Sequence, residues 1–195
     1  YVNMRKNLLA RLSHYYHSIP MPKLVFNYIL RLVGETNRSS IILDYDCGVG
    51  GFTRNIIGRD LRFKKIYAVD KSKEEIKVFN ENIPENYKGK VHIDYRKSWK
   101  IPADIKNVDV FFSFNSLGYV ESLPDFLKHL RKVLRGGGRF CFYIKHSMIN
   151  VTPNALIVED KKKVEEIFTK EKFYVEYHKR KKLLTEEIFI YGRKQ

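Results

Sequence analysis

The stretch Ile41-Ile-Leu-Asp-Tyr-Asp-Cys-Gly-Val-Gly-Gly51 decides the fold of this 195-residue chain. It begins as a short apolar run, which is consistent with a buried strand, and then passes into a loop that contains glycines. A helix over residues 52–57 is expected to follow that loop. A strand, a glycine loop and a helix in this order indicate the first unit of a parallel α/β sheet.

The rest of the chain continues this alternation of strands and helices. We expect further strands at 65–69, 91–93, 108–114 and 139–144, helices at 72–82, 124–134 and 161–168, and two closing strands at 173–178 and 188–191. The closing strands are near enough in sequence to form an antiparallel hairpin. The predicted fold is therefore α/β, with a seven-stranded, mostly parallel sheet, helices on both faces and an antiparallel last strand.

Residues 1–38 predict a helical cap before this core. Apolar residues recur at helical spacing within 8–16 and again within 24–33, where Gly34 ends the pattern. The chain length fits one domain, so we expect a single unit made of the 1–38 cap and the 39–195 core. No apolar run approaches the roughly 20 residues of a membrane-spanning helix, and two cysteines are too few for a disulfide framework. We therefore expect a cytoplasmic protein.

The chain carries a formal net charge of +15, and residues 1–38 and 161–195 contribute +5 each. Such an excess favours anionic partners, and the basic residues 178–182 with the N-terminal cap could bind RNA or an acidic protein segment. A lysine-rich solvated surface explains the same excess, and lysines on an edge strand also prevent aggregation. Both interpretations stay open at this point.

Glycines and a carboxylate follow the first two predicted strands. Gly48 and Gly50 lie in the first loop, and Asp70 ends the second strand. Glycines let a ligand approach the backbone closely, and a carboxylate in this place can bind both hydroxyls of a ribose. The dinucleotide pattern G-x-G-x-x-G fails because Thr53 stands in the third position, which disfavours a nicotinamide enzyme. The His/Cys spacing of a metal site is absent, so no metal is predicted.

The chain resembles the class I S-adenosylmethionine-dependent methyltransferases. The resemblance rests on four segments in the family's order: Ile42–Gly50, Ile66–Asp70, Val108–Leu117 and Leu130–Phe140. Residues 188–194 also match the family's last strand. It implies a Rossmann-like fold, S-adenosyl-L-methionine as cofactor, and in-line methyl transfer to an unidentified acceptor. The segment after the fourth strand looks closest to the broad small-molecule type, so a small-molecule or anionic acceptor is expected.

The resemblance also implies roles for individual residues. Asp44 would steady the loop and the methionine amino group, and Asp70 would bind the ribose. The other implied cofactor contacts are Asp46, Cys47, Gly48, Gly50, Lys71, Phe114 and Asn115. Tyr16, Asn115 and Tyr119 would shape the acceptor pocket, and the candidates for a catalytic role are His146, Asn115 and Tyr119.

Two positions depart from the family pattern. Asp46 replaces the first loop glycine, and aspartate tolerates left-handed backbone angles. The charge of Asp46 favours the ammonium and sulfonium groups of the ligand but repels its carboxylate. Arg54 would offset that repulsion. Lys97 stands where an acid often faces the adenine amino group, with Asp94 and Trp99 as imperfect substitutes. These departures favour the alternative hypothesis, a degenerate methyltransferase-like protein without turnover that binds RNA or a protein partner through its basic ends.

Overall fold

The computed structural model describes residues 21–96, 98–145, 154–181 and 186–195. Their strands form one sheet in the order β3-β2-β1-β4-β5-β7-β6. The strands are β1 (Ile41–Tyr45), β2 (Lys65–Asp70), β3 (Val91–Tyr95), β4 (Val108–Phe114), β5 (Leu134–Lys145), β6 (Phe173–Lys181) and β7 (Glu186–Lys194). β7 is antiparallel to both of its neighbours, β5 and β6, and the other pairs are parallel. The predicted fold class is confirmed.

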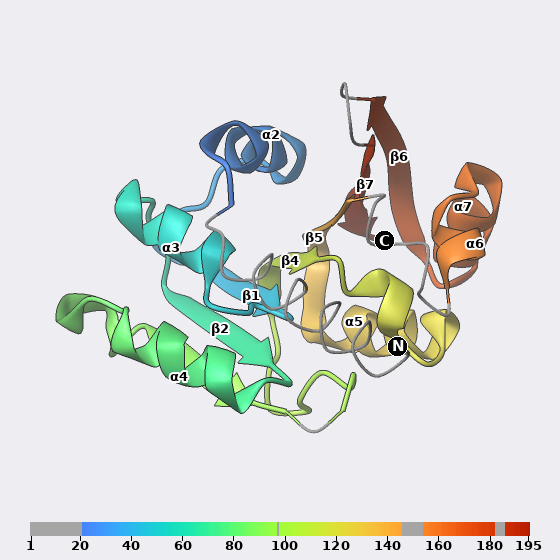
Figure 1. Cartoon of the computed structure of the whole chain (residues 1–195). Helices are drawn as coiled ribbons and strands as arrows, with labels where there is room; N and C mark the ends of the chain where they lie inside the picture. Colours follow the sequence, from blue (N-terminus) through green and yellow to red (C-terminus); the bar gives the residue numbers. More distant parts are fainter. Residues whose placement is uncertain (1–20, 97, 146–153, 182–185) are drawn as a thin grey trace, which may run out of the picture.

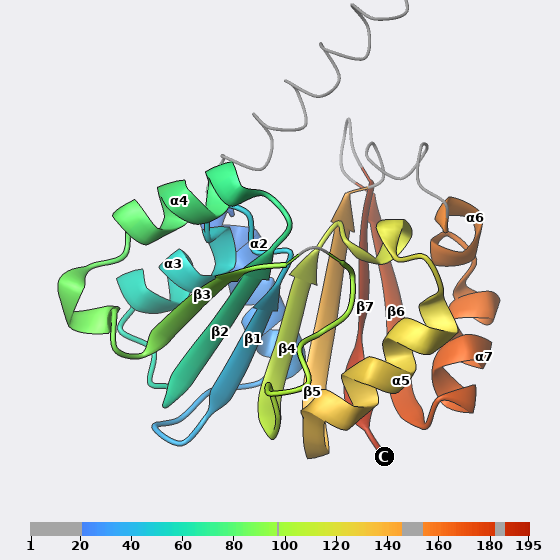
Figure 2. The ribbon, with the colours of Figure 1, turned by 90° about the horizontal axis from the view of Figure 1, so that it is seen from below.

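Helices cover both faces of the sheet (Figures 1 and 2). One face carries α2 (Lys23–Val33), α3 (Gly51–Gly58) and α4 (Lys73–Glu81), and the other carries α5 (Leu123–Val133), α6 (Ala155–Val158) and α7 (Lys161–Lys170). Two short 3-10 turns, η1 (Glu85–Tyr87) and η2 (Leu117–Tyr119), complete the described elements. Successive side chains of a strand point to opposite faces, so Phe111 and Phe112 of β4 enter two separate apolar clusters.

The second predicted helix of the N-terminal cap is α2. Its apolar stripe, Val25, Phe26, Ile29 and Val33, is fully buried and packs against β5 and β7. Because four apolar residues at helical spacing supply most of the stability of such a helix, α2 belongs to the helical layer on the sheet. Residues 1–20 of the cap lie outside the described residues.

The prediction for the start of β5 was wrong by five residues. β5 begins at Leu134, directly after α5, and the glycines at 136–138 lie inside the strand. The register with β4 shifts between Val108 and Val110, which pair with Leu134 and Arg139. A side chain at Gly138 would lie 2.8 Å from the carbonyl oxygen of Val108. The glycines, which indicate a turn by sequence, therefore allow a bulge that brings the two backbones together.

In the described part of the chain, no helix is both long and apolar enough to cross a membrane.

Candidate functional site

A cavity of about 350 Å³ lies at the C-terminal ends of the parallel strands. Its lining comes from the loops after β1, β2 and β4 and from the start of α4: Asp46, Asp70, Lys71, Ser72, Glu75, Phe114, Asn115, Ser116 and Tyr119. In the sheet order, β1 has β2 on one side and β4 on the other, so the cavity lies at the topological switch point where such sheets bind ligands. Six of the candidate residues from the sequence meet there.

Asp70 joins the loop after β1 to the end of β2. Its Oδ2 accepts a hydrogen bond from the backbone N–H of Gly48 at 2.8 Å, and its Oδ1 accepts one from Ser72 N–H at 2.8 Å. Gly48 has φ +54°, a left-handed angle that glycine adopts without strain. An ionised carboxylate has about four lone-pair sites, so Asp70 retains acceptor capacity for the hydroxyls of a ligand.

Asp44 and Thr53 form a buried pair behind the cavity. Oδ2 of Asp44 accepts hydrogen bonds from the hydroxyl of Thr53 at 2.7 Å and from its backbone N–H at 3.2 Å. Burial raises the pKa of Asp44 to about 7, against the lowering effect of the two bonds from Thr53. Thr53, which excluded the dinucleotide pattern, thus anchors the strand-one carboxylate to the first turn of α3.

Replacing Thr53 by valine is expected to destabilise the fold by about 1–3 kcal/mol, since a buried acceptor loses its hydroxyl partner. The hydroxyl favours the ionised form of Asp44, so its loss raises the folded pKa of Asp44 further above the unfolded value. A raised carboxyl pKa removes stability as pH increases. The difference between variant and wild type should therefore grow from pH 5 to pH 8 in urea unfolding. An equal difference at both pH values would contradict this role.

Asp46 adopts the left-handed conformation that the sequence requires of it, with φ +53°. It lines the cavity, and burial raises its pKa to about 7, with Asp70 and Glu75 adding to the rise and Lys71 opposing it. Arg54, the expected counter-charge, is exposed on α3 and is not part of the cavity lining. Lys71 takes the place of Arg54 as the nearby cation.

Cys47 and Gly50 lie behind the cavity and shape the loop. Cys47 is buried, and its backbone N–H donates to Val69 O at 3.1 Å. Gly50 has φ +81°, and a Cβ atom there would overlap the ring of Phe79 in α4. Absence of a side chain at Gly50 thus lets α4 pack against the loop.

Asn115 ties the ends of β4 and β5 together. Its Oδ1 accepts a bond from Lys145 N–H at 2.8 Å, and its own N–H donates to Tyr143 O at 2.9 Å. Asn115 is buried with φ +55°, and the ring of Phe114 stacks on Tyr143 with centroids 5.0 Å apart. The side chain of Asn115 therefore positions the rim on which Phe114 lies.

Tyr119 is the most open aromatic residue of the cavity lining. Its side chain is 45% exposed, and desolvation raises its pKa. A phenol with a raised pKa stays protonated at neutral pH, so Tyr119 can donate a hydrogen bond there and is a poor general base. The candidates His146 and Tyr16 lie outside the described residues.

Sequence reasoning did not include three residues that line the cavity, Ser72, Glu75 and Ser116, among the site candidates. It also missed Asn154, which holds the segment beside the cavity. Glu75 is buried and lines the cavity. Its backbone N–H donates a hydrogen bond to Ser72 Oγ at 3.2 Å, which caps the N-terminus of α4. Asn154 is buried and its Nδ2 donates to Val120 O at 2.7 Å, which holds the segment that carries Tyr119. An isolated asparagine outside any periodic pattern gave no signal for this contact.

Asp94 and Trp99, two of the residues considered for the adenine side, do not line the cavity. Asp94 is exposed and pairs with Arg96 at 3.1 Å. The ring of Trp99 lies over α5, with its centroid 5.9 Å from His129 and 6.3 Å from Phe126. Lys97 lies outside the described residues.

Within the basic segment 178–182, the described residues 179–181 are paired with acids across the hairpin. Lys179 and Lys181 contact Glu186 at 2.7 and 3.7 Å, and Arg180 contacts Glu187 at 3.0 Å. All three cations lie within β6, the edge strand, which runs parallel to β1–β5.

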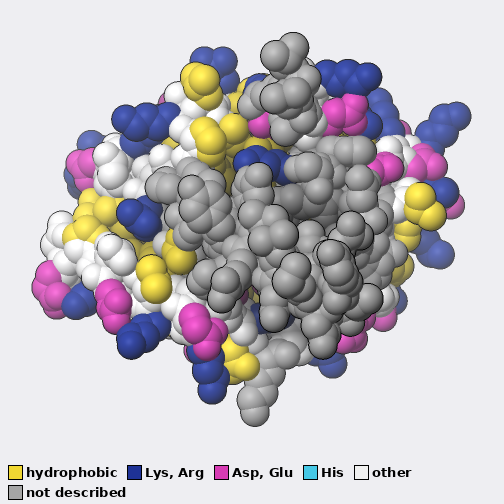
Figure 3. Space-filling model, viewed as in Figure 1, with side chains coloured by type: hydrophobic (Ala, Val, Ile, Leu, Met, Phe, Trp, Pro, Cys, Tyr) yellow, Lys and Arg dark blue, Asp and Glu magenta, His cyan; other side chains and the backbone are white. Residues whose placement is uncertain are grey.

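α2 also contacts this part of the hairpin. The guanidinium of Arg180 lies 4.9 Å from the ring centroid of Tyr28, whose hydroxyl is hydrogen-bonded to His178. On the face shown in Figure 3, Lys and Arg side chains of the described residues are interspersed with Asp and Glu side chains along the outline of the molecule. The local charge at the described end of β6 is therefore largely balanced.

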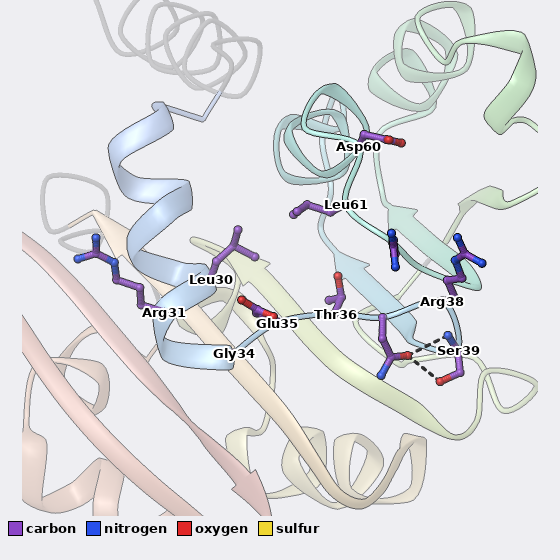
Figure 4. Close-up of a pocket in the computed structure, with 11 residues that line it drawn as sticks. Leu30, Arg31, Gly34, Glu35, Thr36, Arg38, Ser39, Asp60 and Leu61 are labelled. Atoms are coloured by element: carbon purple, nitrogen blue, oxygen red, sulfur yellow. Dashed lines mark hydrogen bonds between the residues drawn. The ribbon is translucent and has the colours of Figure 1, made fainter.

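A second hollow, of about 1110 Å³, lies before the N-terminal ends of β1 and β2, at the end of these strands opposite to the cavity (Figure 4). It opens between the C-terminal end of α2 and the turn after α3, where Leu30 and Leu61 point toward each other, whereas Arg31 points away. None of the candidate residues that the structure describes lines it. Among the described residues, no group of three or more His, Cys, Asp or Glu side chains could hold a metal ion.

Comparison with known proteins identifies the family. The model of the methyltransferase domain family matches residues 43–142, about half of the chain. The chain belongs to the class I S-adenosylmethionine-dependent methyltransferases, whose cofactor is S-adenosylmethionine. No curated protein is a significant match by sequence.

Solved structures share the fold at low sequence identity. Phosphoethanolamine N-methyltransferase 2 from Haemonchus contortus, in complex with S-adenosyl-L-methionine, matches with a TM-score of 0.73 and 14% identity, over 90% of this chain and 53% of that chain. Geranyl diphosphate C-methyltransferase from Streptomyces coelicolor A3(2) matches with a TM-score of 0.69 and 13% identity, over 88% and 77%. An S-adenosylmethionine-dependent methyltransferase from Aquifex aeolicus matches with a TM-score of 0.65 and 18% identity, over 86% of this chain and 88% of that chain.

Proposed function

We propose that this protein transfers a methyl group from S-adenosylmethionine to a small-molecule acceptor. One observation carries the proposal: the loops after β1, β2 and β4 bring six candidate residues to one cavity at the switch point of the sheet. The cavity falls within the range of roughly 300–1,000 Å³ typical of small-molecule sites.

The donors and acceptors of the cavity suit this cofactor. Asp70 has acceptor capacity for two ribose hydroxyls, and the carboxylates of Asp46 and Glu75 suit a ligand that carries positive charge. S-adenosylmethionine would supply a methyl group that is bonded to a positively charged sulfur. A nucleophile of the acceptor would attack the methyl carbon in line and displace the sulfur. Such a displacement demands alignment and exclusion of water more than a side-chain acid or base.

The acceptor side would be formed by the rim after β4. Asn115 holds this rim against β5 through Lys145 N–H, and Tyr119 offers a hydroxyl donor at the mouth of the cavity. We propose that Tyr119 orients the acceptor and that Asn115 positions the rim. An anionic acceptor would also find Lys71 in the lining.

The alternative, a degenerate binding protein for RNA or an acidic protein, has less support. Asp46 favours it by sequence, but the left-handed turn is kept. Each of Lys179, Arg180 and Lys181 also pairs with Glu186 or Glu187, which leaves little unbalanced positive charge at this position.

Calorimetric titration with S-adenosylmethionine and S-adenosylhomocysteine tests the proposed function. We expect dissociation constants in the micromolar range, as for typical enzyme substrates, and slow methyl transfer to a panel of small acceptors when labelled S-adenosylmethionine is supplied. Absence of binding of both compounds at millimolar concentration would refute the proposal. Tight RNA binding with steep salt dependence and no cofactor binding would favour the alternative.

A further inference from the structure

The carboxylates of the cavity are in excess over its cations. Asp46, Asp70 and Glu75 line it, and Lys71 is the one Lys or Arg among the described residues of the lining. The charges of Asp70, Glu75 and Lys71 are close enough to Asp46 to shift its pKa. Ionised, the four side chains leave a charge of −2, which favours a cationic ligand in a partly dehydrated site.

The other acids near the loop already have partners that fix their roles. Oδ2 of Asp44 faces Thr53 behind the loop, and both oxygens of Asp70 accept backbone bonds from Gly48 and Ser72. Asp46 is different, because it lies in the loop itself, stands where the family pattern has a glycine, and lines the cavity directly.

We propose that Asp46 makes this site select the positively charged cofactor over its neutral thioether product. The inference rests on the proposed function, because it assumes that the methionine end of the cofactor lies at this loop. In methyl transfer, a lone pair of the acceptor forms the bond to the methyl carbon, and the electron pair of the broken C–S bond stays on sulfur. The sulfur thereby loses its positive charge, and Asp46 loses its electrostatic partner.

This selectivity would relieve inhibition by the product. Cofactor and product share the adenosine, the amino group and the carboxylate, so groups such as Asp70 bind both equally. The two compounds differ in the methyl group and in the positive charge on sulfur. A carboxylate close to the sulfur therefore stabilises the bound cofactor more than the bound product. Because burial raises the pKa of Asp46 to about 7, the free protein binds a proton there at neutral pH in part of the molecules. A cationic ligand favours the ionised form, so its binding releases protons and strengthens as pH rises through 7.

Replacing Asp46 by asparagine tests the proposal, since asparagine also tolerates left-handed angles. The matched control is Asp104→Asn, which removes the same charge from an exposed position outside the cavity. In calorimetric titration at pH 7.5, we expect D46N to reduce the preference for S-adenosylmethionine over S-adenosylhomocysteine about tenfold, or 1.4 kcal/mol. D104N should keep the wild-type preference. Titrations in two buffers of different ionisation enthalpy should detect proton release with S-adenosylmethionine in the wild type and in D104N. The release should be smaller in D46N, where Asp44 is the remaining one of these two carboxyl groups with a pKa raised to about 7.

The outcomes separate this inference from the proposed function. If the wild type binds neither compound, the proposed function and the inference both fail. If the wild type binds both and D46N weakens both by the same factor, only the inference fails, and Asp46 acts on the amino acid end that the two compounds share. An unchanged preference in D46N overturns the inference as well.

Discussion

Replacing Asp70 by alanine is expected to weaken the binding of S-adenosylmethionine at least tenfold, which corresponds to about 1.4 kcal/mol or more. The carboxylate has two tasks that alanine cannot perform. It accepts the hydrogen bonds from Gly48 and Ser72 that hold the loop after β1 against the end of β2, and by the proposed function it accepts the ribose hydroxyls. Calorimetric titration of the variant measures the loss.

The comparison with Asp46 makes this experiment specific. The ribose is common to cofactor and product, so D70A should weaken S-adenosylmethionine and S-adenosylhomocysteine by the same factor, unlike D46N. Asp94→Ala is the control. Asp94 lies next to the last residue of the neighbouring strand β3, is exposed, and pairs only with Arg96 among the contacts described; a surface ion pair of this kind contributes little stability. Unchanged affinity in D70A would mean that the cofactor binds elsewhere.

Replacing Gly192 by alanine is expected to destabilise the fold by about 3 kcal/mol or more, the size of a severe steric conflict. Gly192 lies in β7 opposite Phe140 of β5 and Val175 of β6. A Cβ atom there would overlap the carbonyl group of Tyr174 in β6. Because the obstacle is backbone, relief requires β6 to move away from β7. Thermal unfolding should show a melting temperature lower by roughly 6–12 °C.

Gly89 provides the matched control for this prediction. It precedes β3, and a side chain there would meet no atom within 4 Å. Gly89→Ala should therefore change stability by no more than about 0.5–1 kcal/mol, and in the stabilising direction if the backbone angles suit alanine. Equal melting temperatures for G192A and the wild type would show that β6 and β7 tolerate a wider spacing than the structure describes.

The architecture could be predicted from the sequence because its signals are local. β1, β2 and β4 each contain a short apolar run, and each is followed by a loop with its own glycine, asparagine or capping residue. The order of these runs, with the position of Asp70 after Gly48 and Gly50, leads to the sheet, the switch point and the family. The signal failed at the glycines of 136–138, because a bulge and a turn use the same residues.

The partners of the site residues depended on packing between distant segments. Asp44 meets Thr53 through the turn into α3, Gly50 faces Phe79 of α4, and Arg180 is balanced by Glu187 across a hairpin. Such contacts follow from the register of strands and the rotation of helices, which no local pattern encodes. Residue order alone thus locates an acidic, glycine-containing loop at the end of β1. Three-dimensional packing determines that Asp46 faces the cavity while Asp44 faces the protein, because only burial and neighbouring charge distinguish two identical carboxylates.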